Sequence, residues 1–210
     1  MDERDKFVAN GHISAQSLKN AVPYTGPSRA VRRLKYINKS PHPDPDYAKP
    51  GDSGMDLRAW IMFEEGHPEN TNVPLDNPDC RPFVTIDTKN GAYRYGIKLK
   101  PLERVLIHTG IYFELDEGCE IQVRPKSGRA LKEGLSILNT PGTVDNQYLG
   151  ECCVIAVNLS NNIITIKDGE KVAQAVVCPV YYKERVELNK VDMFESETER
   201  GSGGFGHTGI

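Results

Sequence analysis

Long hydrophobic runs are missing from this chain of 210 residues. No apolar stretch approaches the length of a membrane-spanning helix, and the N-terminus carries no apolar signal core, so we expect a soluble protein that stays in the cytoplasm. An excess of positive charge is also missing, since the formal net charge is -3. Direct nucleic acid binding is therefore not expected, although a few local cations could still hold a small anion.

The chain also lacks C-x-x-C pairs and any cluster of His, Asp and Glu at metal-ligand spacing. Its five cysteines are an odd number, and most of them lie in strand-like runs. This pattern favours buried free thiols in a reducing compartment over disulfides or a cysteine metal site. His207 stands in the glycine-rich C-terminal end, and we interpret it as a bystander rather than a ligand or base.

Short strand-like segments rich in Val, Ile, Tyr and Phe dominate the second half of the chain, and turn signals separate them. This pattern predicts an all-β sandwich or barrel with one short helix near 127–132. We expect an N-terminal extension at 1–29, a β-domain at 30–186 with an insertion at about 62–96, and a linker with a glycine-rich arm at 187–210. The insertion has the composition of an excursion that could carry a small hairpin of its own.

The last eleven residues, 200–210, combine five glycines with one cation, one aromatic ring and one hydroxyl group. So many glycines cannot form a stable helix or strand. Arg200 offers a charge-assisted fork for phosphate oxygens, Phe205 offers a flat face for a base, and Thr208 adds a hydroxyl. The segment is either a solubilising tail or an arm that clamps a phosphorylated, ring-bearing ligand.

Four further segments place polar residues in turns or next to strands: 50–59, 123–130, 139–151 and 169–177. In the third segment Asp145 ends a Gly-Thr-Val-Asp turn. A carboxylate at such a position is either a turn-former bonded to its own backbone or a general base.

The second and fourth segments carry groups that suit an anionic ligand. Ser127 and Gly128 open the predicted helix, whose N-terminus favours an anion, and Lys126 adds a positive charge. A serine N-cap would also explain Ser127, and the two roles are compatible. Gln174 is surrounded by apolar residues in a predicted strand, so its side chain requires a polar partner.

In this order, the four segments and the glycine-rich arm resemble the five motifs of the trimeric dUTPase (dUTP diphosphatase) family. The resemblance extends over about 30–210, apart from the insertion at 62–96. It implies a distorted jelly-roll barrel that assembles as a homotrimer and hydrolyses dUTP to dUMP and pyrophosphate, with water attacking the α-phosphorus. Such an activity prevents uracil incorporation into DNA and supplies dUMP for thymidylate synthesis.

The resemblance also implies roles for individual residues. Asp145 would orient and deprotonate the attacking water, Asn139 would pair with the uracil edge, and Tyr148 would pack against the deoxyribose. Asp56 would stand beside an Mg²⁺ ion on the triphosphate and act on it through water, because Mg²⁺ tends to keep several waters. The substrate-binding set that the resemblance implies is Lys126, Ser127, Gly128, Asn139, Gly142, Thr143, Val144, Tyr148, Gln174, Arg200, Phe205, Gly206 and Thr208.

Three positions depart from the family pattern. Lys126 replaces an arginine and so keeps the charge but loses the fork. Arg129 stands where an apolar residue is usual, and Leu149 where an arginine is usual. These changes concern phosphate contacts and the subunit interface rather than the reaction class.

Two other functions are compatible with parts of the pattern. A dCTP deaminase shares the fold, but it would need a glutamate base in a different third motif. A dUTP-gated regulatory protein could use the insertion at 62–96 to dock a partner. Both alternatives differ from the main hypothesis in whether pyrophosphate or ammonia is released from dUTP, dCTP and dTTP.

Overall fold

The computed structural model describes residues 34–61, 82–86, 93–181, 183, 186–194, 198 and 201–202, with only the backbone for 82–86 and 93–95. The chain divides into two compact units, 1–179 and 180–210, and the fold belongs to the first. Among the described residues, no helix is both long and apolar enough to cross a membrane.

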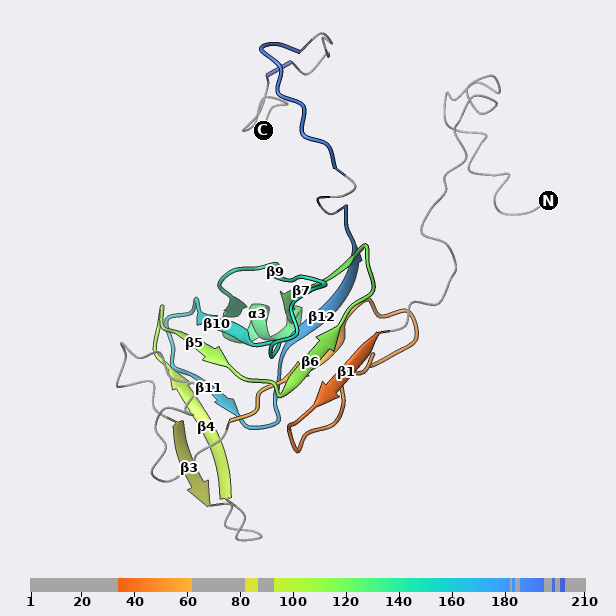
Figure 1. Cartoon of the computed structure of the whole chain (residues 1–210). Helices are drawn as coiled ribbons and strands as arrows, with labels where there is room; N and C mark the ends of the chain where they lie inside the picture. Colours follow the sequence, from red (N-terminus) through yellow and green to blue (C-terminus); the bar gives the residue numbers. More distant parts are fainter. Residues whose placement is uncertain are drawn as a thin grey trace, which may run out of the picture. The chain divides into compact units, whose positions relative to one another are not determined.

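The described part of the chain is built from strands and one short helix, which confirms the predicted all-β class (Figure 1). The elements are β1 (Lys35–Asn38), β2 (Met55–Arg58), β3 (Pro82–Ile86), β4 (Tyr93–Leu99), β5 (Arg104–Ile107), β6 (Ile111–Glu114), β7 (Cys119–Pro125), α3 (Ser127–Glu133), β8 (Leu135–Ile137), β9 (Gly142–Val144), β10 (Val154–Asn158), β11 (Ile164–Lys167) and β12 (Lys171–Pro179).

The strands pair antiparallel in small sheets whose neighbours are mostly distant in sequence. One sheet has the order β2-β12-β7-β9, and the others have the orders β5-β10-β8, β11-β4-β3 and β1-β6. In β5 and β7, buried residues alternate with less buried ones, as expected for strands with one face on a core. The four-stranded sheet brings 55–58, 119–125, 142–144 and 171–179 side by side.

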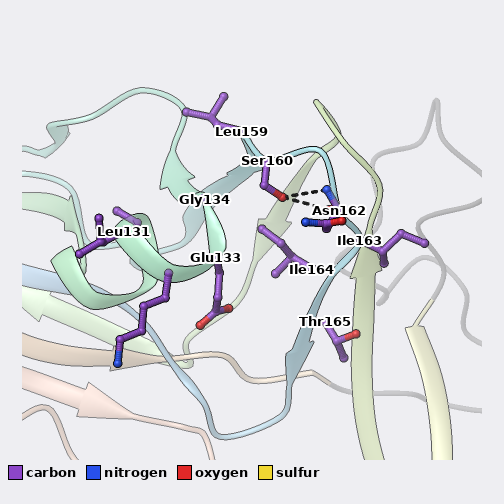
Figure 2. Close-up of a pocket in the computed structure, with 11 residues that line it drawn as sticks. Leu131, Glu133, Gly134, Leu159, Ser160, Asn162, Ile163, Ile164 and Thr165 are labelled. Carbon is purple, nitrogen blue, oxygen red and sulfur yellow. Dashed lines mark hydrogen bonds between the residues drawn. The ribbon is translucent and has the colours of Figure 1, made fainter.

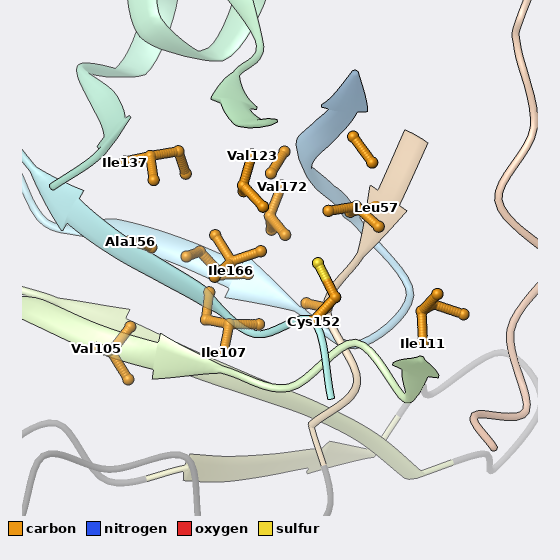
Figure 3. Close-up of a cluster of buried hydrophobic side chains, with 14 of the residues drawn as sticks. Leu57, Val105, Ile107, Ile111, Val123, Ile137, Cys152, Ala156, Ile166 and Val172 are labelled. Atoms are coloured by element: carbon orange, nitrogen blue, oxygen red, sulfur yellow. The ribbon is translucent and has the colours of Figure 1, made fainter. Parts of the chain in front are cut away.

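Aliphatic side chains from almost every strand form one core (Figure 3). Leu57 of β2, Ile107 of β5 and Ile166 of β11 are fully buried in it. The small residues Ala173 and Ala175 of β12 are also fully buried, so this central strand can lie close to its neighbours. Such a core fixes which face of each strand is exposed, because a slip of one residue would turn the apolar set outward.

One predicted boundary differs from the observed elements. The short helix runs one residue beyond the predicted range 127–132, and Gly134 ends it in the left-handed conformation at φ 76. The segment 62–96 contains β3 and the start of β4, which pair with each other, and β4 also pairs with β11. Because β4 continues into the core at Ile97 and Leu99, this part of the segment belongs to the sheet.

Candidate active site

A cavity of about 230 Å³ opens where three of the polar segments meet. Its walls come from the loop before β2, the junction of β7 with α3, and β12. The lining residues are Ala48, Asp52, Ser53, Gly54, Asp56, Lys126, Ser127, Gly128 and Gln174. Five residues of the predicted site therefore share one cavity, although they come from three separate segments of the chain.

The register of β12 brings these segments together. β12 pairs with β2 on one side and with β7 on the other, so Gln174 lies opposite both Asp56 and Arg124. Gln174 Nε2 donates a hydrogen bond to the carbonyl of Pro125 at 2.9 Å. The polar partner that the sequence requires for Gln174 is thus a backbone carbonyl, that of the residue before Lys126.

Gly54 allows Gln174 to take this position. A Cβ at residue 54 would overlap Gln174 Oε1 and lie 3.1 Å from its Cβ. The glycine is therefore needed for a close approach between the loop before β2 and β12, rather than for an unusual backbone angle.

Asp56 is held by two lysines. Lys126 Nζ donates to Asp56 Oδ1, and Lys171 Nζ lies 2.5 Å from Oδ2. The Asp56 side chain is only 11% exposed. Its burial raises the carboxyl pKa, but the hydrogen bonds from Lys126 and Lys171 lower it, and the net pKa lies below the usual value. Asp56 is therefore ionised, and the three groups together carry one positive charge, which suits a polyanion.

Lys171 joins this site without having been identified from the sequence. The residue lies in the fourth polar segment, but its role depends on the pairing of β12 with β2, which contains an irregularity between Lys171 and Ala173. The expected serine cap of α3 is also not observed. Lys126 is the N-cap residue, no side-chain cap bond is formed, and Ser127 is the first helical residue. The exposed Ser127 hydroxyl is thus not used in capping the helix.

The third polar segment contributes β9, an edge strand, to the same sheet. β9 pairs with β7, so that Gly142 lies opposite Val123. Val144 and Gly142 are buried, whereas Thr143 between them is exposed. The Val144 side chain belongs to the core. Gly142 has no side chain and that of Val144 is buried, so these two residues can offer a ligand only their backbone groups. The exposed side chain of Thr143 lies between them.

Asn139 and Asp145 flank β9 and are both exposed. A Cβ at Gly142 would lie 3.1 Å from Asn139 Nδ2, so the amide of Asn139 lies close to the start of β9. The peptide bond between Thr140 and Pro141 is cis. Asp145 follows directly after the buried Val144, which directs the next side chain away from the core.

Tyr148 is half-exposed, at 49%, and is therefore not a core aromatic. Its backbone N–H donates to the carbonyl of Asp145 at 3.1 Å, which closes a turn between the two residues. Its phenol donates to the carbonyl of Glu151 at 3.1 Å, and its ring covers Gly150 so closely that a Cβ there would overlap it. Burial raises the pKa of the Tyr148 phenol. The ring is held as a partly exposed wall next to Asp145.

Glu151, whose carbonyl accepts the Tyr148 hydrogen bond, is itself held by contacts of its carboxylate. Its Oε1 accepts hydrogen bonds from the backbone of Thr109 at 2.9 Å and of Gly110 at 2.7 Å. Its Oε2 lies 2.6 Å from His108 Nδ1. Hydrogen bonds with Cys153 and with Glu151 raise the pKa of His108 to about 10. Burial raises the pKa of Glu151, but the hydrogen bonds from His108 and Gly110 lower it below its usual range.

The structure shows the surroundings of two residues that depart from the family pattern, Arg129 and Leu149. Arg129 bonds within the chain, since its guanidinium contacts Glu133 at 2.6 Å and Glu170 at 3.3 Å. Leu149 is exposed next to Tyr148. The Arg129 guanidinium therefore stabilises α3 against the β11–β12 turn.

Part of the predicted site lies outside the described residues: Arg200, Phe205, Gly206 and Thr208. A second cavity, of about 530 Å³, is lined by the end of α3 and the β10–β11 connection (Figure 2). None of the predicted site residues lines it. Leu131, Leu159 and Ile163 are exposed at this second cavity, which is therefore much more apolar at its rim than the first.

Comparison with known proteins identifies the family of the chain. A family model described as dUTPase matches residues 92–209. A deoxyuridine 5'-triphosphate nucleotidohydrolase of Finegoldia magna is 40% identical over 84% of this chain and 99% of its own length. The enzyme of that name from Fusobacterium nucleatum is 42% identical over 73% of this chain and 97% of its own length.

Solved structures with the same fold include the dUTPase of Staphylococcus bacteriophage 80alpha with dUPNHPP. That structure superposes with a TM-score of 0.61 at 22% identity, covering 86% of this chain and all of that one. The dUTPase of the S. aureus phage phi11 gives a TM-score of 0.54 at 19% identity, covering 79% of this chain and all of that one. With the matched motifs at one sheet and relatives of this identity and coverage, the chain belongs to the dUTPase family.

Proposed function

We propose that the chain hydrolyses dUTP to dUMP and pyrophosphate. The observation that carries the proposal is the meeting of four motif segments on the sheet β2-β12-β7-β9. β12 and β7 frame the cationic cavity, and β9 leads into the turn with Asp145 and Tyr148. This strand order supports a site with a phosphate-binding part at β12 and β7 and a base-and-sugar part next to β9.

The cationic cavity is suited to hold the phosphates. Lys126 and Lys171 supply charge, and the exposed Ser127 and Gly128 begin α3, where the first N–H groups have no partner within the helix. Charge-assisted hydrogen bonds from such groups are the strong ones for phosphate oxygens. Gln174 lines the same cavity and adds a polar side chain to it.

Asp145 acts as the general base in this proposal. Its exposed carboxylate accepts the proton of a water molecule as that water attacks the α-phosphorus, and pyrophosphate leaves on the opposite side. The chain contributes by positioning the water and the phosphate, since little covalent chemistry is needed from the protein. Tyr148 packs against the deoxyribose and leaves no room for a 2′-hydroxyl, while Asn139 and the backbone of β9 read the uracil.

Mg²⁺ supplies charge neutralisation on the triphosphate when it is bound. Asp56 fits a cation that is held through water, because both of its carboxylate oxygens already accept hydrogen bonds from lysines. Asp56 and the phosphate oxygens would hold the ion, whereas Lys126 and Lys171 keep the Asp56 side chain in place.

Assembly and the C-terminal arm complete the proposal. We propose a homotrimer in the cytoplasm, with Arg200, Phe205, Gly206 and Thr208 closing over the nucleotide, and the family membership and the composition of the arm support this proposal. The division into an extension at 1–29, a β-domain at 30–186 and an arm at 187–210 belongs to the same proposal. The deaminase and regulatory alternatives are not favoured by the curated relatives, which are named as nucleotidohydrolases.

The test is a pyrophosphate-release assay with Mg²⁺ and each of dUTP, dCTP, dTTP and UTP, with ammonia measured in parallel. We expect pyrophosphate from dUTP alone and no ammonia from any nucleotide. Ammonia from dCTP would show a deaminase instead. Binding of dUTP without any release would show a nucleotide-gated binding protein.

A further inference from the structure

A second group of ligating side chains lies behind Tyr148 and takes no part in the proposed hydrolysis. β10 pairs antiparallel with β5 so that Val154 lies opposite Ile107, which brings the preceding Cys153 next to His108. Glu151 joins them from the same segment. The Nδ1 of His108, a carboxylate oxygen of Glu151 and the Sγ of Cys153 all lie within 4.8 Å of one another.

These three atoms converge on one point. Glu151 Oε2 lies 2.6 Å and Cys153 Sγ 3.8 Å from the same ring nitrogen, Nδ1 of His108. A catalytic relay needs the carboxylate on one ring nitrogen and the thiol on the other, so that a proton can pass through the ring. Here both groups face one nitrogen, which is the arrangement of ligands around a shared centre.

Hydrogen bonds within the protein already hold the segments that carry the three side chains. The second oxygen of Glu151, Oε1, is held by the N–H groups of Thr109 and Gly110, which leaves Oε2 directed at His108. Thr109 Oγ1 donates to the carbonyl of Cys152 at 2.7 Å and joins the two chain segments. Outer contacts of this kind orient metal ligands and are important for metal affinity. All three ligands are partly buried.

We propose that His108, Glu151 and Cys153 bind a Zn²⁺ ion, with water in a fourth position. Nitrogen, carboxylate oxygen and thiolate sulfur are the ligand types that Zn²⁺ takes. Tetrahedral Zn²⁺ places such atoms about 3.4–3.6 Å apart, given the usual Zn–N, Zn–O and Zn–S lengths. The observed pair distances of 2.6 and 3.8 Å are within 1 Å of that geometry. Among the described residues, this is the only such three-residue group.

This site differs from the Mg²⁺ position at Asp56 in chemistry and does not depend on dUTP hydrolysis. Mg²⁺ takes oxygen ligands, so a site with one imidazole and one thiolate discriminates against it. A Zn²⁺ ion at this site would link His108, in the β5–β6 connection, to Glu151, whose backbone carbonyl accepts the hydrogen bond of Tyr148. The ion would therefore rigidify the turn behind the sugar-binding tyrosine.

Two other thiols, Cys152 and Cys178, provide an internal comparison. Cys152 points into the core beside Ile107 and Ile111 (Figure 3), and burial raises its pKa to about 12. Cys178 is a free, partly buried thiol whose Sγ accepts a hydrogen bond from Arg124 at 3.4 Å. Cys178 is therefore a matched control, with a similar exposure to Cys153 and no place in the group of three.

The experiment uses the full chain, stripped with EDTA and kept in Mg²⁺ without nucleotide. Zn²⁺ and Co²⁺ are titrated in, and the Co²⁺ form is followed by its thiolate charge-transfer absorption. We expect one equivalent of Zn²⁺ and a thiolate band with Co²⁺. Cys153→Ser and His108→Asn should weaken Zn²⁺ binding by about 10-fold or more, whereas Cys178→Ser should leave it unchanged. Unchanged affinity in Cys153→Ser, or a Co²⁺ form without the band, would overturn the proposal.

A second measurement needs no variant and covers the case in which Cys153→Ser does not fold. The unmodified chain is treated with iodoacetamide with and without Zn²⁺, and alkylation is located by mass spectrometry. Zn²⁺ should slow alkylation of Cys153 and leave that of Cys178 unaffected. Equal alkylation of Cys153 in both conditions would also overturn the proposal.

Discussion

Lys126 donates a hydrogen bond to Oδ1 of Asp56, although the two residues lie 70 positions apart in the chain. Lys171 holds the other oxygen of the same carboxylate. One largely buried carboxylate thus connects three of the polar segments and keeps two ammonium groups next to the cavity. Since a buried charge needs such partners, the arrangement fixes the positions of the lysines before any ligand binds.

Gly54→Ala should disturb the site through Gln174. The added Cβ has to displace the Gln174 amide, which breaks its hydrogen bond to Pro125, a contact of about 1 kcal/mol. We expect weaker dUTP binding, measured as a higher KM. In the double variant with Gln174→Ala, the effect of Gly54→Ala should largely vanish, because the group it displaces is gone. Fully additive effects would show that Gly54 acts on another part of the cavity.

Asp145→Asn should retain dUTP binding and lose about 10²–10⁴-fold in turnover. The amide has nearly the same shape, but it cannot accept the proton of the attacking water. Single-turnover rates and a nucleotide-binding titration measure the two properties separately. Turnover close to that of the unchanged chain would remove Asp145 from the role of general base.

Tyr148→Ala should admit ribonucleotides. The half-exposed ring stands beside Asp145, and its removal opens space at the 2′ position. The preference for dUTP over UTP should fall by about 10- to 200-fold, the range for one steric contact in a pocket. Tyr148→Phe is the control, since it keeps the ring and loses only the hydrogen bond to Glu151. If both variants kept the full preference, the sugar would be read elsewhere.

The sequence predicts most of the functional side chains of the cavity, but it does not predict all the charges that surround Asp56. Motif positions identify Asp56, Lys126 and Gln174, because their spacing within each segment is local. Lys171 is not identified, because its contact with Asp56 depends on how β12 pairs with β2 across a bulge. The local pattern predicts helix α3, but it does not predict a free Ser127 hydroxyl next to an N-cap at Lys126.

The group of His108, Glu151 and Cys153 could not be found from spacing. His108 and Cys153 are 45 residues apart, and neither belongs to a recognisable metal-ligand pattern. They meet because β5 and β10 pair in a particular register. In an all-β protein such neighbours depend on long-range pairing, which local composition does not specify.

His108 should make the stability depend on pH at the alkaline end. Its folded pKa of about 10 is above its ordinary value of 6.5, so its stabilising contribution is complete below pH 6.5 and is lost as the pH rises through about 10. In EDTA, the difference in Tm between the unchanged chain and His108→Gln should be largest below pH 6.5 and small above pH 10. A difference that stayed constant with pH would contradict the charged state of His108.

Deletion of 200–210 should leave the fold intact and remove most of the turnover. The described buried hydrophobic residues all lie between Met55 and Val176, so the deletion removes none of this core. We expect Tm to change by less than about 2 °C, which corresponds to no more than about 1 kcal/mol for a chain of this size.

The loss of turnover has a separate cause. Ordering a glycine-rich arm is entropically costly, so the arm should close only over bound nucleotide, with Phe205 on the uracil and Arg200 on the phosphates. Without it, positioning and water exclusion fail, and turnover should fall by about 10²-fold or more. Deletion of 1–29, where no substrate-binding residue is predicted, is the matched control. Equal turnover in both deletions would eliminate the arm as a lid, and a large fall in Tm without ligand would make the arm a structural element instead.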